Sequence, residues 1–323
     1  VGDYADYLVY NKEFTAYQVD FRIAAQDNEG KIGLYLLDDS GSREFELLQI
    51  ETPKTGGWQT WTTVSVNSKP LVQYIVIIFM FIAGTNFVLS YFGFKFNFKK
   101  IFKDEEFKIY TFILIGFTIS VALIVYFSTG FLTEIDSQLH RIEGVFRHSL
   151  FQVVSIITTT GFVTADYTSW SPLLILLFFG MMFLGGSSGS TSGGFKIMRH
   201  LLIIKNGILQ FKKILHPHAI IPLRYNKSSV SNEITYNILG FFIVYMLSFI
   251  VGTIVFALFG LDFESALGVS ASSLGNVGPS IGSYGPLNTF SELPNLAKWW
   301  SSFLMLLGRL ELFTVLILSL IHI

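Results

Sequence analysis

Two short polar segments interrupt long apolar stretches of this chain, and both carry the oxygen atoms that a bare cation needs. All their residues are uncharged: Thr158, Thr159, Thr160 and Gly161 form the first segment, and Asn276, Val277 and Gly278 form the second. Irregular backbone is not tolerated against lipid, so such segments must be buried in protein or line a watery cavity. Ion filters use rings of backbone carbonyls in place of a hydration shell. The segments therefore predict a filter built from repeated units, and ordinary loops between packed helices are the alternative.

The chemistry of these segments favours a monovalent cation. Neither segment contains a carboxylate, whereas Ca²⁺ sites usually include several. The apolar stretches 145–157 and 264–274 are too short to span a bilayer and predict re-entrant helices. Their negative C-terminal ends would point towards the polar segments and favour a cation there.

A glycine-serine run, GGSSGSTSGG at 185–194, follows the apolar stretch 172–184. Repeated glycine disfavours a regular helix. We predict a flexible flap that gates the path beneath the filter, and close helix packing through small residues is the alternative. The residues assigned to gating are the glycines Gly185, Gly186, Gly189, Gly193 and Gly194.

Two further charged features accompany the apolar stretches. Arg309 lies inside the last one, where a charge is costly and indicates function by default. We predict that it faces the pore and imposes a positive barrier, and the alternative is that it caps carbonyls of a neighbouring interrupted helix. Asp104, Glu105 and Glu106 lie beside lysines, and we interpret them as a solvated helix start. The sequence has no Ser-His-Asp arrangement or phosphate-binding loop, so we do not expect an enzyme.

The apolar content places most of the chain in a membrane. Charged residues make up 14% of it, whereas a soluble domain carries about 25%. The stretches long enough to span are 71–92, 109–131, 235–260 and 299–321. A span, a re-entrant helix, a polar segment and another span occur twice in this order, which predicts an internal repeat of about 110–120 residues. Matching interrupted segments of this kind are typical of a transport site.

Lysine and arginine predict the orientation of the chain in the membrane. The segments 93–108 and 196–232 are rich in both and should be cytoplasmic, whereas 131–144 and 261–298 are poor in both and should be external. We therefore expect a multi-pass protein of the cell (inner) membrane, surrounded by membrane lipid, with residues 1–70 outside. The net charge of −1 argues against a nucleic-acid partner, and the lack of cysteine excludes thiolate metal sites.

Residues 1–70 have a different pattern, with apolar residues at every second position. The strands expected from this alternation are 4–10, 16–25, 31–39 and 61–66. They predict a truncated, sandwich-like β fragment. Trp58 and Trp61 would lie on opposite faces of a strand, one in the core and the other exposed. The exposed tryptophan is a candidate platform for a sugar ring, or else it caps the edge of the sheet.

The membrane part, about 71–323, resembles the Trk/Ktr/HKT family of potassium transporters, and most closely its TrkH branch. The matching stretches are FMFIAGTNFVLSYF, FQVVSIITTTGF, GGSSGSTSGGFKIMR, LHPHAIIPLRY, SLGNVGPSIG and MLLGRLELFTVL. The resemblance implies a mainly α transmembrane fold with a potassium-channel-like architecture, in which repeated units of helix, pore helix, filter loop and helix surround a K⁺ path. It also implies filter glycines at Gly161 and Gly278, a gating loop at 185–194 and a pore-facing Arg309.

The family pattern has four repeats, and this chain holds about half of them. We assign the end of one repeat and a cytoplasmic loop to 71–108, a third-type repeat to 109–232 and a fourth-type repeat to 233–323. Half a ring cannot enclose an ion, so we expect the chain alone to be inactive. The resemblance further implies a homodimer and a cytoplasmic nucleotide-binding regulatory subunit, with K⁺ as the transported ion and no covalent cofactor.

The N-terminal part resembles a family 6 carbohydrate-binding module. The matching stretches are VGDYADYLVY, YQVDFRIAAQDNEGKIGLYL and TGGWQTWTTVSV. This resemblance implies that Trp58 stacks on a sugar and that a polysaccharide is a partner. The junction near Lys69–Leu71 joins two incomplete patterns, and we interpret it as a chimera or an assembly error, with a natural fusion as the alternative. The alternative function is therefore an extracellular polysaccharide-binding module fused to a membrane anchor.

Overall fold

A computed structural model of the chain contains two compact units, Val1–Lys69 and Pro70–Ile323. The residues that the structure describes are 18–23, 31–37, 43–51, 62–67, 70–128, 138–216, 218–219 and 221–310. Trp58, Trp61 and the expected strand 4–10 lie outside these ranges, as does most of the second half of the expected span 299–321.

The first unit contains two antiparallel strand pairs. Its strands are β1 (Gln18–Ile23), β2 (Lys31–Leu37), β3 (Arg43–Glu51) and β4 (Thr62–Asn67). β1 pairs with β4, and β2 pairs with β3 with register shifts near the end of β2. Three strands fall in the expected stretches, whereas β3 is additional, and the sandwich-like packing of the strands stays a prediction.

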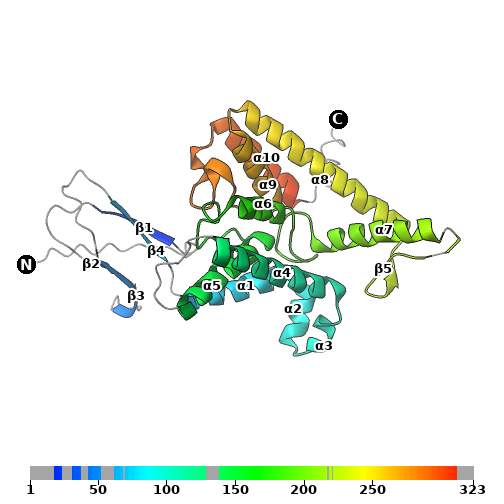
Figure 1. The fold of residues 1–323 in the computed structure, drawn as a ribbon, viewed down its shortest axis with the longest axis horizontal. Coiled ribbons are helices and arrows are strands. Elements are labelled where there is room, and N and C mark those ends of the chain that lie inside the picture. Colours follow the sequence, from blue (N-terminus) through cyan, green and yellow to red (C-terminus); the bar gives the residue numbers. More distant parts are fainter. Residues whose placement is uncertain are drawn as a thin grey trace, which may run out of the picture. The chain divides into compact units, whose positions relative to one another are not determined.

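The second unit is mainly helical (Figure 1). Its α-helices are α1 (Pro70–Ala83), α2 (Phe87–Phe94), α3 (Phe98–Ile101), α4 (Glu105–Ser128), α5 (Gln138–Ile157), α6 (Pro172–Met181), α7 (Ile197–Leu215), α8 (Asn232–Leu258), α9 (Phe263–Gly275) and α10 (Asn295–Arg309). The shorter elements are the hairpin strands β5 (Arg224–Tyr225) and β6 (Ser228–Ser229) and the 3₁₀ helices η1 (Gly282–Tyr284) and η2 (Phe290–Glu292). The predicted mainly α transmembrane fold is confirmed.

The helices repeat one packing pattern. α4 packs against α5, and α5 against α6; in the same way α8 packs against α9, and α9 against α10. α1 also contacts α5, while α7 contacts both α4 and α8. Each repeat therefore consists of a long outer helix, a pore helix that stops short, a loop and a second helix, as the sequence predicts.

Two helices, α4 and α8, are long and apolar enough to cross a membrane, among the residues that the structure describes. α1 and α2 pass the same test only together, and they are bent by 117° at the break between them. The stretch 71–92, expected as a span, therefore forms a pair of helices with a sharp bend between them. The re-entrant helix expected over 264–274 matches α9 within one residue at each end, whereas α5 begins seven residues before the expected position 145.

Polar groups between α1 and α2 cause the bend. Thr85 Oγ1 donates to the Ile82 carbonyl at 2.6 Å, and the backbone leaves the helical path at this point. Asn86 caps α2, because its side-chain oxygen accepts from the backbone N–H of Val88 at 2.8 Å. A Cβ on Gly84 would overlap the Tyr110 hydroxyl. The bend therefore depends on a glycine that lets α4 approach closely.

α5 begins early because the polar side chains in its first half have hydrogen-bond partners. Arg147, only 8% exposed, donates through Nε to Glu143 at 2.8 Å and through Nη1 to the side chain of Gln73 on α1. Tyr74 also donates to Glu143, at 3.0 Å. A buried charge needs partners of this kind, so these bonds satisfy the polar first half of α5 and tie it to α1.

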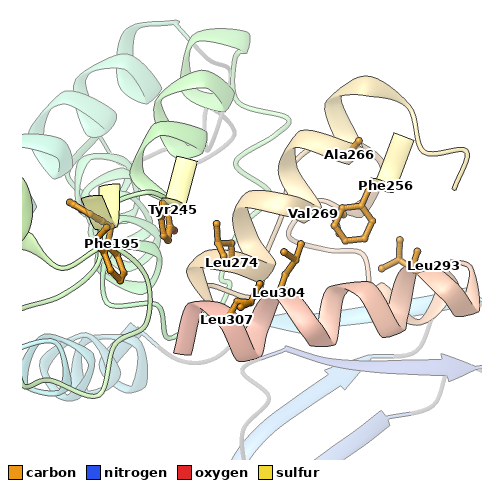
Figure 2. Packing of buried hydrophobic residues seen from close by; sticks show 11 residues of the cluster. Phe195, Tyr245, Phe256, Ala266, Val269, Leu274, Leu293, Leu304 and Leu307 are labelled. Atoms are coloured by element: carbon orange, nitrogen blue, oxygen red, sulfur yellow. The ribbon is translucent and has the colours of Figure 1, made fainter. Parts of the chain in front are cut away.

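Small residues allow α9 to lie at the centre of its repeat. Figure 2 shows Val269 and Leu274 of α9 against Leu304 of α10, with Phe256 of α8 beside them. Every α9 residue from Ser265 to Gly275 except Leu267 is buried. Asp262 caps the start of α9, because its side-chain oxygen accepts from the Ser265 N–H at 3.1 Å. The hydrogen bonds from Ser265 lower the pKa of the Asp262 carboxyl. α9 is thus fixed at its N-terminus and along its whole length, which sets the place where it ends.

Candidate ion pathway

Both polar segments begin directly at the C-terminus of a pore helix and turn in the same way. In the first pore loop (158–162, after α5), Thr159 has φ of 53° and Gly161 has φ of 81°. In the second pore loop (276–279, after α9), Asn276 has φ of 54° and Gly278 has φ of 111°. The left-handed region at matching positions explains why both loops carry a glycine. The two loops are thus copies of one backbone structure.

A serine in the last turn of each pore helix holds the loop that follows. Ser155 Oγ donates to the Phe162 carbonyl at 2.6 Å. Ser272 Oγ donates to the Gly278 carbonyl at 2.9 Å and accepts from the Gly278 N–H at 3.1 Å. The sequence analysis did not identify these serines, although each is the first residue of the echoing stretches SIITTTGF and SSLGNVGP.

The two pore loops contact each other. A Cβ on Gly161 would overlap the Val277 carbonyl oxygen, and a Cβ on Gly278 would lie 3.4 Å from Gly161 Cα. The backbones can therefore come this close only because both residues lack a side chain. Gly278 is exposed, whereas the Val277 side chain is buried. That side chain is a hydrocarbon, so Val277 can offer only its backbone carbonyl to a bound ion.

The hydroxyls of the first pore loop have different partners. Thr158 Oγ1 donates to the Val154 carbonyl at 2.7 Å and lies 2.8 Å from Thr160 Oγ1. Thr159 Oγ1 instead accepts from the Gly193 N–H at 2.7 Å. The first pore loop is thereby hydrogen-bonded to the glycine-serine run.

The glycine-serine loop (185–194) is packed in this structure against two neighbours, the break at Gly84 and the C-terminus of α9. The Ser187 N–H donates to the Gly84 carbonyl at 2.9 Å. A Cβ on Gly193 would lie 2.8 Å from the Gly275 carbonyl, and one on Gly186 would lie 2.8 Å from that of Gly84. The other predicted gating glycines, Gly185, Gly189 and Gly194, lie in the same loop, the last two with φ of 71° and 67°. Close packing of small residues describes this conformation, and the flap motion stays a prediction.

Arg309 ends α10 beside the same loop. Its side chain is exposed, and its Nη1 donates to the Thr191 carbonyl at 2.5 Å. This contact agrees with the alternative in which Arg309 caps a carbonyl of an interrupted segment. The positive barrier in the pore stays a prediction.

Glu106 corrects one interpretation of the sequence. It is only 3% exposed, so the acidic run is not solvated at this residue. Its Oε1 accepts from the Ser188 N–H of the glycine-serine loop at 2.6 Å. Nothing in the local sequence around Glu106 indicates a partner in a segment so distant along the chain. The sequence analysis therefore did not predict that Glu106 is buried.

The contacts between loops agree with the predicted sidedness. Asn226, in the second basic segment, donates through Nδ2 to Asp104, in the first, at 2.7 Å. Beyond the two pore loops, the Tyr167 hydroxyl donates to the Ser280 carbonyl at 2.7 Å. The two basic segments therefore lie together, as expected of segments on one side of a membrane.

Two matching pore loops follow helices that pack against membrane-crossing helices, and the break between α1 and α2 lies beside the first of these loops. This arrangement defines a pore-type membrane transport protein. The profile of the TrkH family, described as cation transport protein, matches residues 62–323. The chain therefore belongs to the TrkH family, which consists of transporters and not of enzymes.

Relatives and a solved structure are similar over most of the membrane unit. The Trk system potassium uptake protein TrkH of Halomonas elongata is 32% identical over 283 residues, which are 86% of this chain and 56% of that protein. TrkH of Salmonella typhimurium is 32% identical over 83% of this chain and 54% of its own. The crystal structure of the potassium transporter TrkH from Vibrio parahaemolyticus has a TM-score of 0.70 and 32% identity over 77% of this chain and 52% of that one. The chain spans about half the length of these relatives.

Proposed function

We propose that this chain forms part of a pore through which K⁺ enters the cell. The observation that carries the proposal is the contact between two pore loops of the same backbone conformation, both built from uncharged residues. The similar proteins are described as potassium uptake proteins. Two loops enclose only half a ring, so the chain forms part of the filter and not the whole of it.

Each predicted site residue has a role in this proposal. Backbone and hydroxyl oxygens of Thr158, Thr159, Thr160 and Gly161 and backbone oxygens of Asn276, Val277 and Gly278 replace water around K⁺. The glycine-serine loop closes the path beneath them, and Arg309 adds a positive charge at that level. The exposed apolar side chains of α4 and α8 face membrane lipid. A homodimer and a cytoplasmic nucleotide-binding subunit complete the assembly, with residues 1–70 on the external side.

Growth of cells that lack their own K⁺ uptake at low external K⁺ tests the proposal. The full-length protein that carries these residues should support growth, and Gly161→Ala should abolish it because the added Cβ overlaps the Val277 carbonyl. Gly116→Ala on α4 is the matched control, since no other described atom lies within 4 Å of its Cβ position. Equal growth of the two variants would contradict the proposal.

A second proposal concerns the first unit, in which Trp58 binds a polysaccharide on the external side. Its basis is the resemblance of the stretch TGGWQTWTTVSV to carbohydrate-binding modules. The detergent-solubilised chain should then sediment with an insoluble glucan, and Trp58→Ala should release it. Trp299→Ala is the control, because Trp299 is 77% exposed on α10. Retention of both variants alike, or of neither, would reject the sugar site.

A further inference from the structure

A short hairpin and the glycine-serine loop are bound to one buried carboxylate. Glu106 Oε1 accepts from the Ser188 N–H at 2.6 Å, and Glu106 Oε2 accepts from the Tyr225 hydroxyl at 3.3 Å. Tyr225 lies in β5, which pairs with β6 to form the hairpin 224–229. Two segments on either side of α7 therefore meet at a single side chain.

The hairpin is also held to the start of α4 by contacts that do not involve the glycine-serine loop. Lys205 Nζ pairs with Glu105 Oε2 at 2.5 Å and donates to the Arg224 carbonyl at 3.1 Å. Asn226 donates to Asp104 Oδ2 at 2.7 Å and accepts from the Glu105 N–H at 2.9 Å. These bonds fix the hairpin beside Glu106, so a displaced hairpin would first lose its contact with that carboxylate.

We propose that Glu106 is a positioning residue that holds the glycine-serine loop packed while the hairpin is docked. Hydrogen bonds to an ionised acceptor are about twice as strong as neutral ones, and a buried carboxylate needs all of its partners. Loss of the Tyr225 hydroxyl therefore weakens the hold of Glu106 on Ser188. This inference rests on the proposed function only in that the loop gates the ion path.

The chemistry of Tyr225 suits this role. Burial raises the pKa of Tyr225, and the Glu106 carboxylate raises it further. The phenol thus stays protonated and remains a donor at physiological pH. Its bond is the longer of the two at Glu106, so it is the weaker contact and the one that a shift of the hairpin breaks first.

Thiol labelling of the loop tests the coupling, because the chain has no cysteine of its own. Ser187→Cys places a thiol beside Ser188, at a position only 1% exposed. Ser149→Cys on α5 is a matched reporter with 0% exposure. Within the part of the chain that the structure describes, neither serine hydroxyl has a hydrogen-bond partner, so both substitutions are mild. A maleimide reaches either thiol only when the structure opens locally.

Combined with these reporters, Tyr225→Phe should raise the labelling rate of Ser187→Cys about two- to fivefold, as expected for one weak hydrogen bond. Glu106→Ala should raise it about tenfold or more, because the Ser188 N–H then also loses its acceptor. Neither should change the rate of Ser149→Cys. Tyr236→Phe is the control, since Tyr236 is 70% exposed on α8.

Two outcomes would overturn the coupling. One is a Tyr225→Phe labelling rate equal to that of Tyr236→Phe, and the other is an equal rise at both reporters, which would indicate general loosening. The labelling rates need no ion flow. If Gly161→Ala grew as well as Gly116→Ala while the labelling pattern held, the result would therefore reject K⁺ uptake and support the coupling.

Discussion

The first pore loop is hydrogen-bonded to the glycine-serine loop, whereas the second is hydrogen-bonded to the last helix of its own repeat. Thr159 accepts from the Gly193 N–H at 2.7 Å. The matching residue, Asn276, donates through Nδ2 to the Met305 carbonyl on α10 at 3.1 Å. The same backbone is thus supported by the glycine-serine loop in one case and by a helix in the other.

The residue types at this position determine how strongly each loop depends on its hydrogen-bond partner. Asn adopts the left-handed region more readily than most residues, whereas a β-branched residue such as Thr is a genuine outlier there. Thr159 therefore depends on its partner in the glycine-serine loop more than Asn276 depends on Met305. We infer that displacement of the glycine-serine loop loosens the first pore loop before the second.

The largest expected effect separates the glycines of the two pore loops, Gly161 and Gly278. Gly161→Ala introduces both a left-handed alanine and an overlap with the Val277 carbonyl, which together should cost about 3 kcal/mol or more. Gly278→Ala meets its nearest atom only at 3.4 Å, so backbone strain alone should cost about 1–3 kcal/mol. Thermal unfolding in detergent measures both. A larger loss for Gly278→Ala would contradict the packing of the two loops.

The sequence predicted those features that depend on local pattern. The long apolar runs of α4 and α8 and the short run of α9 specify helices of definite length, and the echo of the two polar stretches predicts matching loops. Contacts between distant segments leave no such trace. The bend at Gly84 depends on Tyr110, and the burial of Glu106 depends on Ser188. Neither Gly84 nor Glu106 differs in type from residues that lie in ordinary helices.

Exchange of the residue types at Thr159 and Asn276, which both have a left-handed backbone, tests the comparison directly. Thr159→Asn replaces a strained residue with a tolerant one and keeps a side-chain oxygen for the Gly193 N–H, so it should stabilise the protein by up to about 1 kcal/mol. Asn276→Thr should destabilise it by about 1–3 kcal/mol, because it adds the strain and removes the bond to Met305. Thermal unfolding of both variants provides the measurement. Equal and opposite shifts would mean that the partners of the two loops do not matter.

A further pair of expected effects concerns the serines at the ends of the pore helices. Ser155→Ala removes one hydrogen bond, to Phe162, and should cost about 1 kcal/mol. Ser272→Ala removes two hydrogen bonds to Gly278 and leaves the Gly278 N–H without that acceptor. This substitution should therefore lower the free energy of unfolding by about 2 kcal/mol. Ser302→Ala is a control on the exposed face of α10, where the hydroxyl bonds only to its own helix. Ser272→Ala should therefore show the larger fall in unfolding temperature, and the reverse order would mean that the second loop does not depend on its own repeat for support.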